Sequence, residues 1–192
     1  MSRFMVDLNP AQRRAVCSIK GPLLVLAGAG TGKTRVITHR IAHMLATGIS
    51  PKAILAVTFT NKAAGEMKER LIRLVPGKAS RELTVGTFHS FCVRSLRQFA
   101  DRIGISKNFG ICDADDQLVA IKQALRELQI SETEIQPKAC LARVSLLKNQ
   151  LVAPHKFMKS EDDWERLIGR AYMRYDQRLR VSGLLDFDDL LL

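Results

Sequence analysis

The first hundred residues alternate between short apolar runs and longer stretches with helical periodicity. Each run is typical of a buried parallel strand, and each following stretch repeats its apolar residues three or four positions apart. The pattern predicts strands over 23–27, 54–59 and 83–88, and helices over 34–48, 61–75 and 90–104. Strands that alternate with helices through short connections predict an α/β fold with a doubly wound parallel sheet, whose strand-to-helix loops lie along one edge.

The pattern changes after about residue 107. Three stretches with polar starts predict helices over 113–130, 137–151 and 160–180. Asp113 and Ser160 are the expected N-caps, and Pro137 suits a first helical turn. The sequence is therefore expected to divide into an α/β core over 1–106 and an all-helical part over 107–192.

Composition and charge narrow the class of protein. The 192 residues are 46% hydrophobic and 26% charged, no apolar stretch reaches 18 residues, and the N-terminus lacks a secretory h-region. Four cysteines without a CxxC pair suit a reducing cytoplasm, so we expect a cytoplasmic protein without a membrane partner. Of the net charge of +11, residues 1–100 contribute 16 Lys and Arg against 4 Asp and Glu, and residues 101–192 contribute 14 against 15. This asymmetry favours polyanion binding by the first half, although a solvated basic surface is the alternative.

A glycine-rich loop follows the first predicted strand. It fits the phosphate-loop pattern G-x-x-x-x-G-K-[ST], except that Ala27 replaces the first glycine. Lys33 would face the β- and γ-phosphates of ATP, and the Thr34 hydroxyl would coordinate Mg²⁺. The backbone N–H groups of the loop would surround the phosphates, a role for Gly28, Ala29, Gly30, Thr31 and Gly32. The alternative is a flexible glycine turn without a ligand.

Polar residues also follow the second and third predicted strands. Phe59 could stack on an unpaired base, and Thr60, Asn61 and Lys62 provide donors beside a helix N-terminus. The alternative is that Phe59 lies in the core and Asn61 is only an N-cap. The third strand end repeats the arrangement with Thr87, Phe88 and His89. Two such ends on one sheet edge predict a track for single-stranded DNA.

Two weaker features lie near the chain ends. Gln12 in LNPAQ carries both a donor and an acceptor, so its amide could contact the N6/N7 edge of adenine. The segment LLDFDDLLL predicts a helix start with Asp186 as its cap. The apolar run before Asp186 is too short to fit a Walker B strand well.

Together the motifs LNPAQRRAV, VLAGAGTGKTRVITHRIAH, AVTFTNKAAGEMKERL, GTFHSF and LDFDDLLL resemble superfamily 1 DNA helicases of the UvrD/Rep/PcrA type, and Rep-like members most of all. The resemblance implies a P-loop, RecA-like parallel sheet with helices on both faces and an all-helical insertion subdomain that touches duplex DNA. It implies ATP and Mg²⁺ as cofactors, single-stranded DNA and single-strand/duplex junctions as partners, and roles in DNA repair or replication. It places Gln12 and Arg35 at adenine, Lys33 and Thr34 at phosphate and Mg²⁺, and Phe59, Asn61 and His89 on the DNA path. Ala27 matches the Ala-Gly start that is usual in this family.

The resemblance also implies elements that these residues do not contain. The family's Walker B Asp-Glu block, its glutamine sensor and a second RecA-like domain with arginine fingers are absent from the sequence. We therefore expect an N-terminal part of a 3′-to-5′ helicase, with negligible ATP turnover alone. A stand-alone, non-hydrolysing ATP- or DNA-binding adaptor and the N-terminus of a helicase-nuclease are the alternatives.

Overall fold

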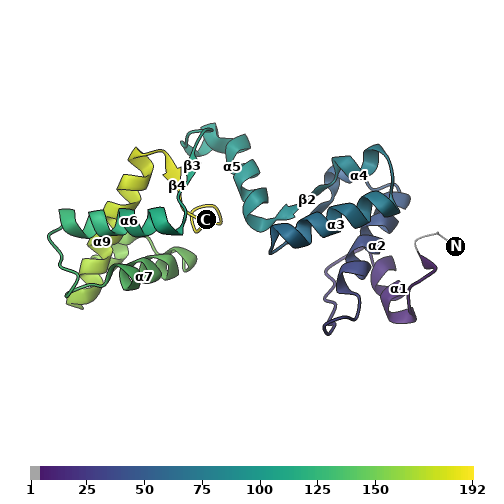
Figure 1. Cartoon of the computed structure of the whole chain (residues 1–192), viewed down its shortest axis with the longest axis horizontal. Helices are drawn as coiled ribbons and strands as arrows, with labels where there is room; N and C mark the ends of the chain where they lie inside the picture. Colours follow the sequence, from purple (N-terminus) through teal and green to yellow (C-terminus); the bar gives the residue numbers. More distant parts are fainter. Residues whose placement is uncertain (1–4) are drawn as a thin grey trace. The chain divides into compact units, whose positions relative to one another are not determined.

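The computed structural model describes residues 5–192, which form two compact units (Figure 1). One unit ends at Phe91 and the other begins at Cys92, so the division lies inside helix α5 (Phe88–Ile103). The assignment of 1–106 and 107–192 as functional domains stays a prediction. Within residues 5–192, no helix is both long enough and apolar enough to cross a bilayer.

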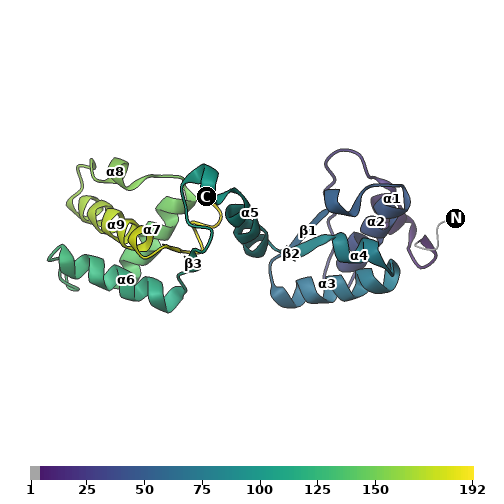
Figure 2. The ribbon, with the colours of Figure 1, turned by 90° about the horizontal axis from the view of Figure 1, so that it is seen from above.

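The first unit is built on two parallel strands that follow the predicted alternation. Strands β1 (Leu55–Thr58) and β2 (Thr84–Thr87) pair in register, and α3 (Asn61–Leu74) packs against both (Figure 2). The other elements are α1 (Pro10–Cys17), α2 (Lys33–Ala46), the 3₁₀ turn η2 (Pro51–Ala53) and α4 (Lys78–Glu82). The larger of the buried clusters in this unit consists of Ile41, Ile54, Ala56, Met67, Leu71, Leu83 and Val85. These positions are the inward faces of the predicted strands and helices, so this part of the prediction is confirmed.

The prediction of a strand over residues 23–27 is wrong. The segment has no regular structure, and Leu24 and Leu26 are 82% and 86% exposed. A strand needs a neighbour for its backbone N–H and C=O groups. Among the described residues β1 pairs only with β2, so the sheet has two strands and the 23–27 segment has no partner. The apolar composition of a segment therefore does not by itself make a strand.

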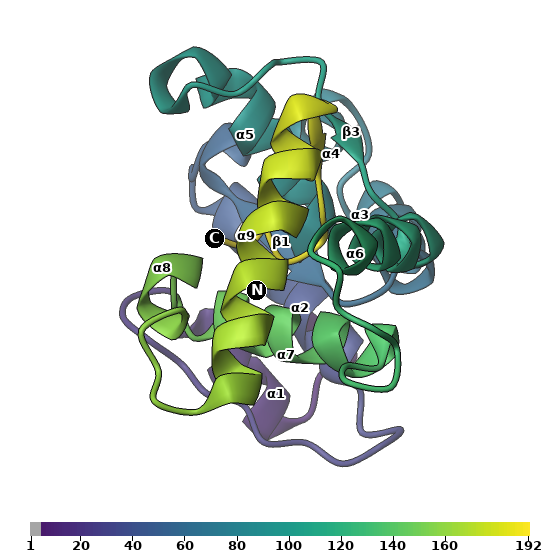
Figure 3. The same ribbon diagram turned by 90° about the vertical axis from the view of Figure 1, so that its left-hand side faces the viewer.

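The second unit is mainly helical. It contains most of α5, α6 (Ala114–Glu127), α7 (Pro137–Asn149), α8 (Pro154–Phe157) and α9 (Asp163–Val181). Figure 3 shows α9 between α6, α7 and α8, and it packs against all three. The core combines one face from each of α6, α7 and α9, with Ile121, Leu125, Cys140, Val144, Leu147, Ile168, Tyr175 and Leu179 among its buried residues.

Two details of this unit differ from the sequence-based expectations. The unit is not all-helical, because β3 (Gly110–Ile111) and β4 (Leu184–Leu185) form a short parallel pair. Helix α9 is capped by Asp162, whose carboxylate accepts from the Glu165 N–H, whereas the Ser160 hydroxyl donates to Glu165 instead. Asp113 caps α6 and Pro137 begins α7, as predicted.

Candidate functional site

The glycine-rich loop leads directly into helix α2. Gly30 and Gly32 adopt φ values of +75° and +91°, which side-chain-bearing residues rarely adopt. Gly32 occupies the N-cap position, and no side chain caps the helix. The first N–H groups of α2 are therefore available to an anion, which the positive end of the helix dipole also favours.

Lys33 folds back over the loop. Its ammonium donates to the carbonyl oxygens of Ala27 at 3.1 Å and Gly28 at 2.8 Å, and the side chain stays exposed. The Thr31 hydroxyl also donates to the Gly28 carbonyl, at 2.7 Å. The two partners of Lys33 are neutral oxygen atoms at the surface, so a phosphate oxygen could replace these carbonyls. Thr34, in the first turn of α2, is half-buried.

Gln12 lies against this loop, although it is 19 residues away in the sequence. Its side-chain N–H donates to the Thr31 carbonyl at 3.1 Å. Asn9, Gln12, Gly28, Thr31 and Lys33 line one cleft of about 280 Å³ together with neighbouring apolar residues. The structure thus brings the predicted adenine contact and the phosphate loop into one concave site.

Arg35 is the second residue, after Gln12, for which the resemblance implies a contact with the base. Its guanidinium pairs with the Asp7 carboxylate at 3.5 Å, and both side chains are largely exposed. Exposed ion pairs of this kind contribute little to stability, so the pair leaves Arg35 free to exchange partners.

The carboxyl ends of β1 and β2 lie side by side. Thr58 is opposite Thr87 in the parallel ladder, and the aromatic residues that follow them are neighbours. The ring centroids of Phe59 and Phe88 are 5.7 Å apart with an interplanar angle of 47°. Phe59 is 89% exposed, so the alternative that it lies in the core is wrong. The two strand ends therefore form one edge with an exposed aromatic face.

At this edge some polar side chains form hydrogen bonds within the chain, and others are exposed to solvent. The Thr60 hydroxyl caps α3 by accepting from the Ala63 N–H, so Asn61 is not the N-cap. Asn61 and Lys62 are exposed in the first turn of α3.

At the second strand end, Thr87 is buried, and its hydroxyl accepts from the Ser90 N–H. His89 is half-buried, and like Phe88 it belongs to the first turn of α5. The exposed donors at the edge are consequently those of α3.

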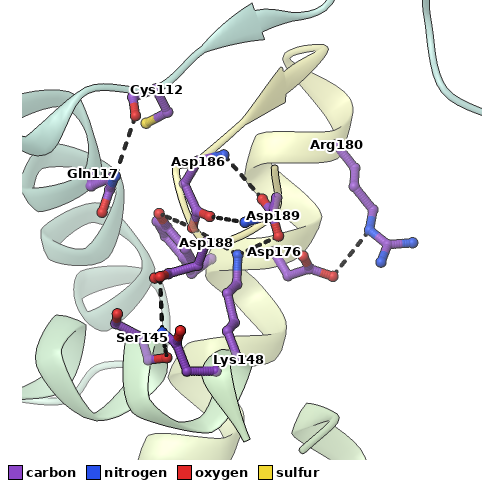
Figure 4. Close-up of polar contacts among 11 residues, drawn as sticks. Cys112, Gln117, Ser145, Lys148, Asp176, Arg180, Asp186, Asp188 and Asp189 are labelled. Carbon is purple, nitrogen blue, oxygen red and sulfur yellow. Dashed lines mark hydrogen bonds and ion pairs between the residues drawn. The ribbon is translucent and has the colours of Figure 1, made fainter. Parts of the chain in front are cut away.

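The second unit contains a buried ionic cluster that sequence reasoning missed (Figure 4). The Lys148 ammonium lies 2.7 Å from a carboxylate oxygen of Asp186 and 2.7 Å from one of Asp189. The Tyr175 hydroxyl donates to Asp186 at 2.9 Å, and its ring lies 5.3 Å from the ammonium. Lys148 is only 1% exposed. The cluster joins α7 and α9 to the segment after β4.

The sequence does contain one indication of this cluster. Lys148 continues the apolar face of α7 formed by Cys140, Val144 and Leu147, where a lysine is exceptional. A charged residue at a core position predicts an opposite charge nearby, but the sequence does not say which acid supplies it.

The protonation equilibria of the cluster follow from one cation between two carboxylates. Burial opposes ionisation of Asp186, but Lys148 and the hydrogen bonds to the carboxylate outweigh it and lower the pKa. Burial, with the negative charge of Asp186, raises the pKa of Asp189. Burial also disfavours the charged form of Lys148, yet the two carboxylates raise its pKa. Asp186 and Lys148 are therefore the principal ion pair.

Comparisons with known proteins identify the family of this chain. Residues 8–192 match the family described as the UvrD/REP helicase N-terminal domain. The chain is 44% identical over 193 residues to the ATP-dependent DNA helicase PcrA of Bacillus subtilis, and 44% identical over 194 residues to the PcrA proteins of Staphylococcus epidermidis and Staphylococcus aureus. Each match covers 100% of this chain and 26% of the relative, so the chain spans about a quarter of their length. The chain therefore belongs to the UvrD/REP helicase N-terminal domain family.

Proposed function

We propose that the chain is the ATP- and single-stranded-DNA-binding part of a DNA helicase that moves 3′-to-5′. The observation that carries this proposal is the pairing of two sites in the first unit. One is an uncapped helix N-terminus behind a glycine loop, and the other is an exposed aromatic edge at the ends of β1 and β2. The names of the relatives support a motor that uses ATP on DNA, and the polarity rests on the resemblance of the motifs.

The loop fits Mg-ATP by its chemistry. Positive φ angles at Gly30 and Gly32 turn the chain around a space for phosphate, and the α2 N–H groups face it. In the proposed complex Lys33 exchanges its carbonyl partners for phosphate oxygens, and Thr34 supplies a hydroxyl to Mg²⁺. Gln12 and Arg35 would contact adenine.

The edge fits single-stranded DNA. Phe59 would stack with a base, Asn61 and Lys62 would contact the backbone, and Thr87, Phe88 and His89 would complete the path. The acidic residues of the first unit are few, which favours DNA over a cationic ligand. Single-strand/duplex junctions are the proposed substrate of the complete motor.

We propose that nucleotide binding by these residues is accompanied by negligible turnover. The described residues that line the loop's cleft include no aspartate or glutamate that could orient an attacking water. Titration with Mg-ATP in a calorimeter should show binding, whereas a coupled ATPase assay with an oligonucleotide should show no turnover above background. Loss of binding in Lys33→Ala would support the loop assignment. Rapid DNA-stimulated hydrolysis would contradict the proposal of negligible turnover but not the proposal of nucleotide binding.

The DNA-binding part has its own test. Phe59→Ala should weaken binding of an oligonucleotide by about 1–3 kcal/mol, the usual contribution of one stacked base. Fluorescence anisotropy at several salt concentrations measures this, and the affinity should fall steeply as salt rises. Phe99→Ala, which removes a partly exposed phenylalanine in the second unit, is the matched control. Equal affinities for Phe59→Ala and the unsubstituted chain would refute the aromatic edge as a DNA contact.

A further inference from the structure

Helix α5 begins directly after strand β2, with no loop residue between them. The strand ends at Thr87 and the helix starts at Phe88. The backbone therefore changes from extended to helical at a single peptide link. Any rotation at this link would move the Phe88 ring relative to the end of the strand.

The Ser90 hydroxyl holds this junction. It accepts from the Thr87 backbone N–H at 2.9 Å and donates to the Thr87 carbonyl at 2.9 Å. The Thr87 hydroxyl in turn accepts from the Ser90 backbone N–H at 3.2 Å. Two of these bonds form a reciprocal capping box, with serine in the position that glutamate or glutamine usually occupies. The bond to the carbonyl needs a donor, which a carboxylate lacks, so the hydroxyl alone fixes both polar groups of the Thr87 backbone.

Phe88 lies inside this box, and its ring is the neighbour of the Phe59 ring. The two centroids are 5.7 Å apart, and the rings are tilted by 47°. Phe88 is 43% exposed and Phe59 is 89% exposed, so Phe88 is the more enclosed of the two. A ring that is almost fully exposed has few contacts to hold its orientation, and the tilted contact with Phe88 supplies one. The position of Phe88 therefore influences how Phe59 is presented.

We propose that Ser90 is a positioning residue for single-stranded DNA, because its hydroxyl holds Phe88 where it supports the exposed Phe59 ring. The inference rests on the proposed binding of DNA at this edge and adds how the aromatic face is kept in place. Ser90 is half-buried and acts through the Thr87 backbone, so it needs no contact with DNA.

A double-mutant cycle on the 192-residue chain tests the proposal, with oligothymidylate affinity measured by fluorescence anisotropy. Ser90→Ala should weaken binding on the order of three- to tenfold, because both bonds of the hydroxyl are lost. In the Phe88→Ala background the same substitution should change the affinity by less than about twofold, since the ring it positions is absent. Ser90→Thr keeps the hydroxyl and should bind like the unsubstituted chain. Ser95→Ala, in the same helix, is the matched control and should leave the affinity unchanged.

Two further ligands separate positioning from a loss of fold. The nucleotide loop belongs to the same unit, so Ser90→Ala should bind Mg-ATP like the unsubstituted chain. An abasic oligonucleotide has the backbone without bases, and Ser90→Ala should also bind it unchanged, because stacking is absent. An equal loss for the abasic strand and oligothymidylate, or equal losses in both backgrounds of the cycle, would overturn the inference.

Amide hydrogen exchange gives a test that does not depend on the folding of a variant. In the unsubstituted chain the Thr87 N–H should exchange slowly, because the Ser90 hydroxyl accepts it, whereas the uncapped N–H groups at the start of α2 should exchange faster. Fast exchange at Thr87 would refute the box.

Failure of the inference and failure of the proposed function are distinct outcomes. If the unsubstituted chain bound no oligonucleotide, the proposed DNA binding itself would fail. If Phe59→Ala weakened binding and Ser90→Ala did not, only the positioning role of Ser90 would fail.

Discussion

The two units each contain a lysine that lies among oxygen atoms, and the comparison separates a ligand site from a structural one. Lys33 is exposed and donates to two neutral carbonyls in a glycine loop. Lys148 is 1% exposed and lies between two carboxylates, with Tyr175 beside it. A phosphate can displace a neutral carbonyl from an exposed ammonium. It cannot displace buried opposite charges whose separation would leave each unpaired in the core.

The largest expected effect comes from removing the buried lysine. Lys148→Ala leaves two uncompensated carboxylates in the core and should destabilise the second unit by about 3–5 kcal/mol. Urea unfolding monitored by fluorescence reports this unit selectively, because the only tryptophan, Trp164, lies in α9. Lys138→Ala, an exposed position on the same helix, is the control. A cost below 1 kcal/mol for Lys148→Ala would mean that the cluster relaxes or admits water.

Neutralising Asp186 and neutralising Asp189 should lower stability by different amounts. Asp186 accepts from Lys148, Tyr175 and the Asp189 N–H, whereas Asp189 accepts from Lys148 and the Asp186 N–H. Asp186→Asn should therefore cost about 1.5–3 kcal/mol and Asp189→Asn about 0.5–1.5 kcal/mol, since the second also removes an unbalanced negative charge. The same unfolding assay compares them at neutral pH. The reverse order would show that Asp189 is the principal partner of Lys148.

The dependence of the free energy of unfolding on acidic pH tests the same comparison. The pKa of Asp186 is lower in the folded chain, so its contribution is present above its ordinary value of 3.8 and is lost as pH falls through the folded pKa. The pKa of Asp189 is raised, so its contribution runs in the opposite sense and partly offsets that of Asp186. We expect unfolding monitored by Trp164 to be less dependent on pH below about 4 in Asp186→Asn than in the unsubstituted chain. An identical slope would contradict the assignment.

The smallest expected effect on stability belongs to the exposed lysine. Lys33→Ala removes only surface hydrogen bonds to carbonyls and should change the free energy of unfolding by no more than about 0.5 kcal/mol. Circular dichroism during thermal unfolding would measure it. A large loss of stability would mean that Lys33 holds the loop together in the absence of nucleotide, and would remove the distinction between the two lysines.

The sequence predicted the elements whose signals are local. The helix over 61–75, the two paired strands and the Asp113 cap all follow from period, capping residues and glycine or proline stops. Residues 23–27 show the limit of such reasoning, because a strand requires a partner that the segment's own composition does not provide. The cap of α9 shows a smaller limit. Ser160 and Asp162 are both good caps, and only backbone geometry selects Asp162.

The sequence by itself determined the chemistry available to this protein: a glycine loop ending in lysine and threonine, two strand ends followed by phenylalanine, and a basic first half. These depend on residue type and short spacing, which a linear pattern records. Only the tertiary structure decided which distant groups meet. Gln12 contacts Thr31, and Phe59 lies beside Phe88. Lys148 pairs with Asp186, from which it is separated by 38 positions in the sequence. Such contacts depend on how helices and strands pack, and for a buried charge that packing determines whether it has a partner at all.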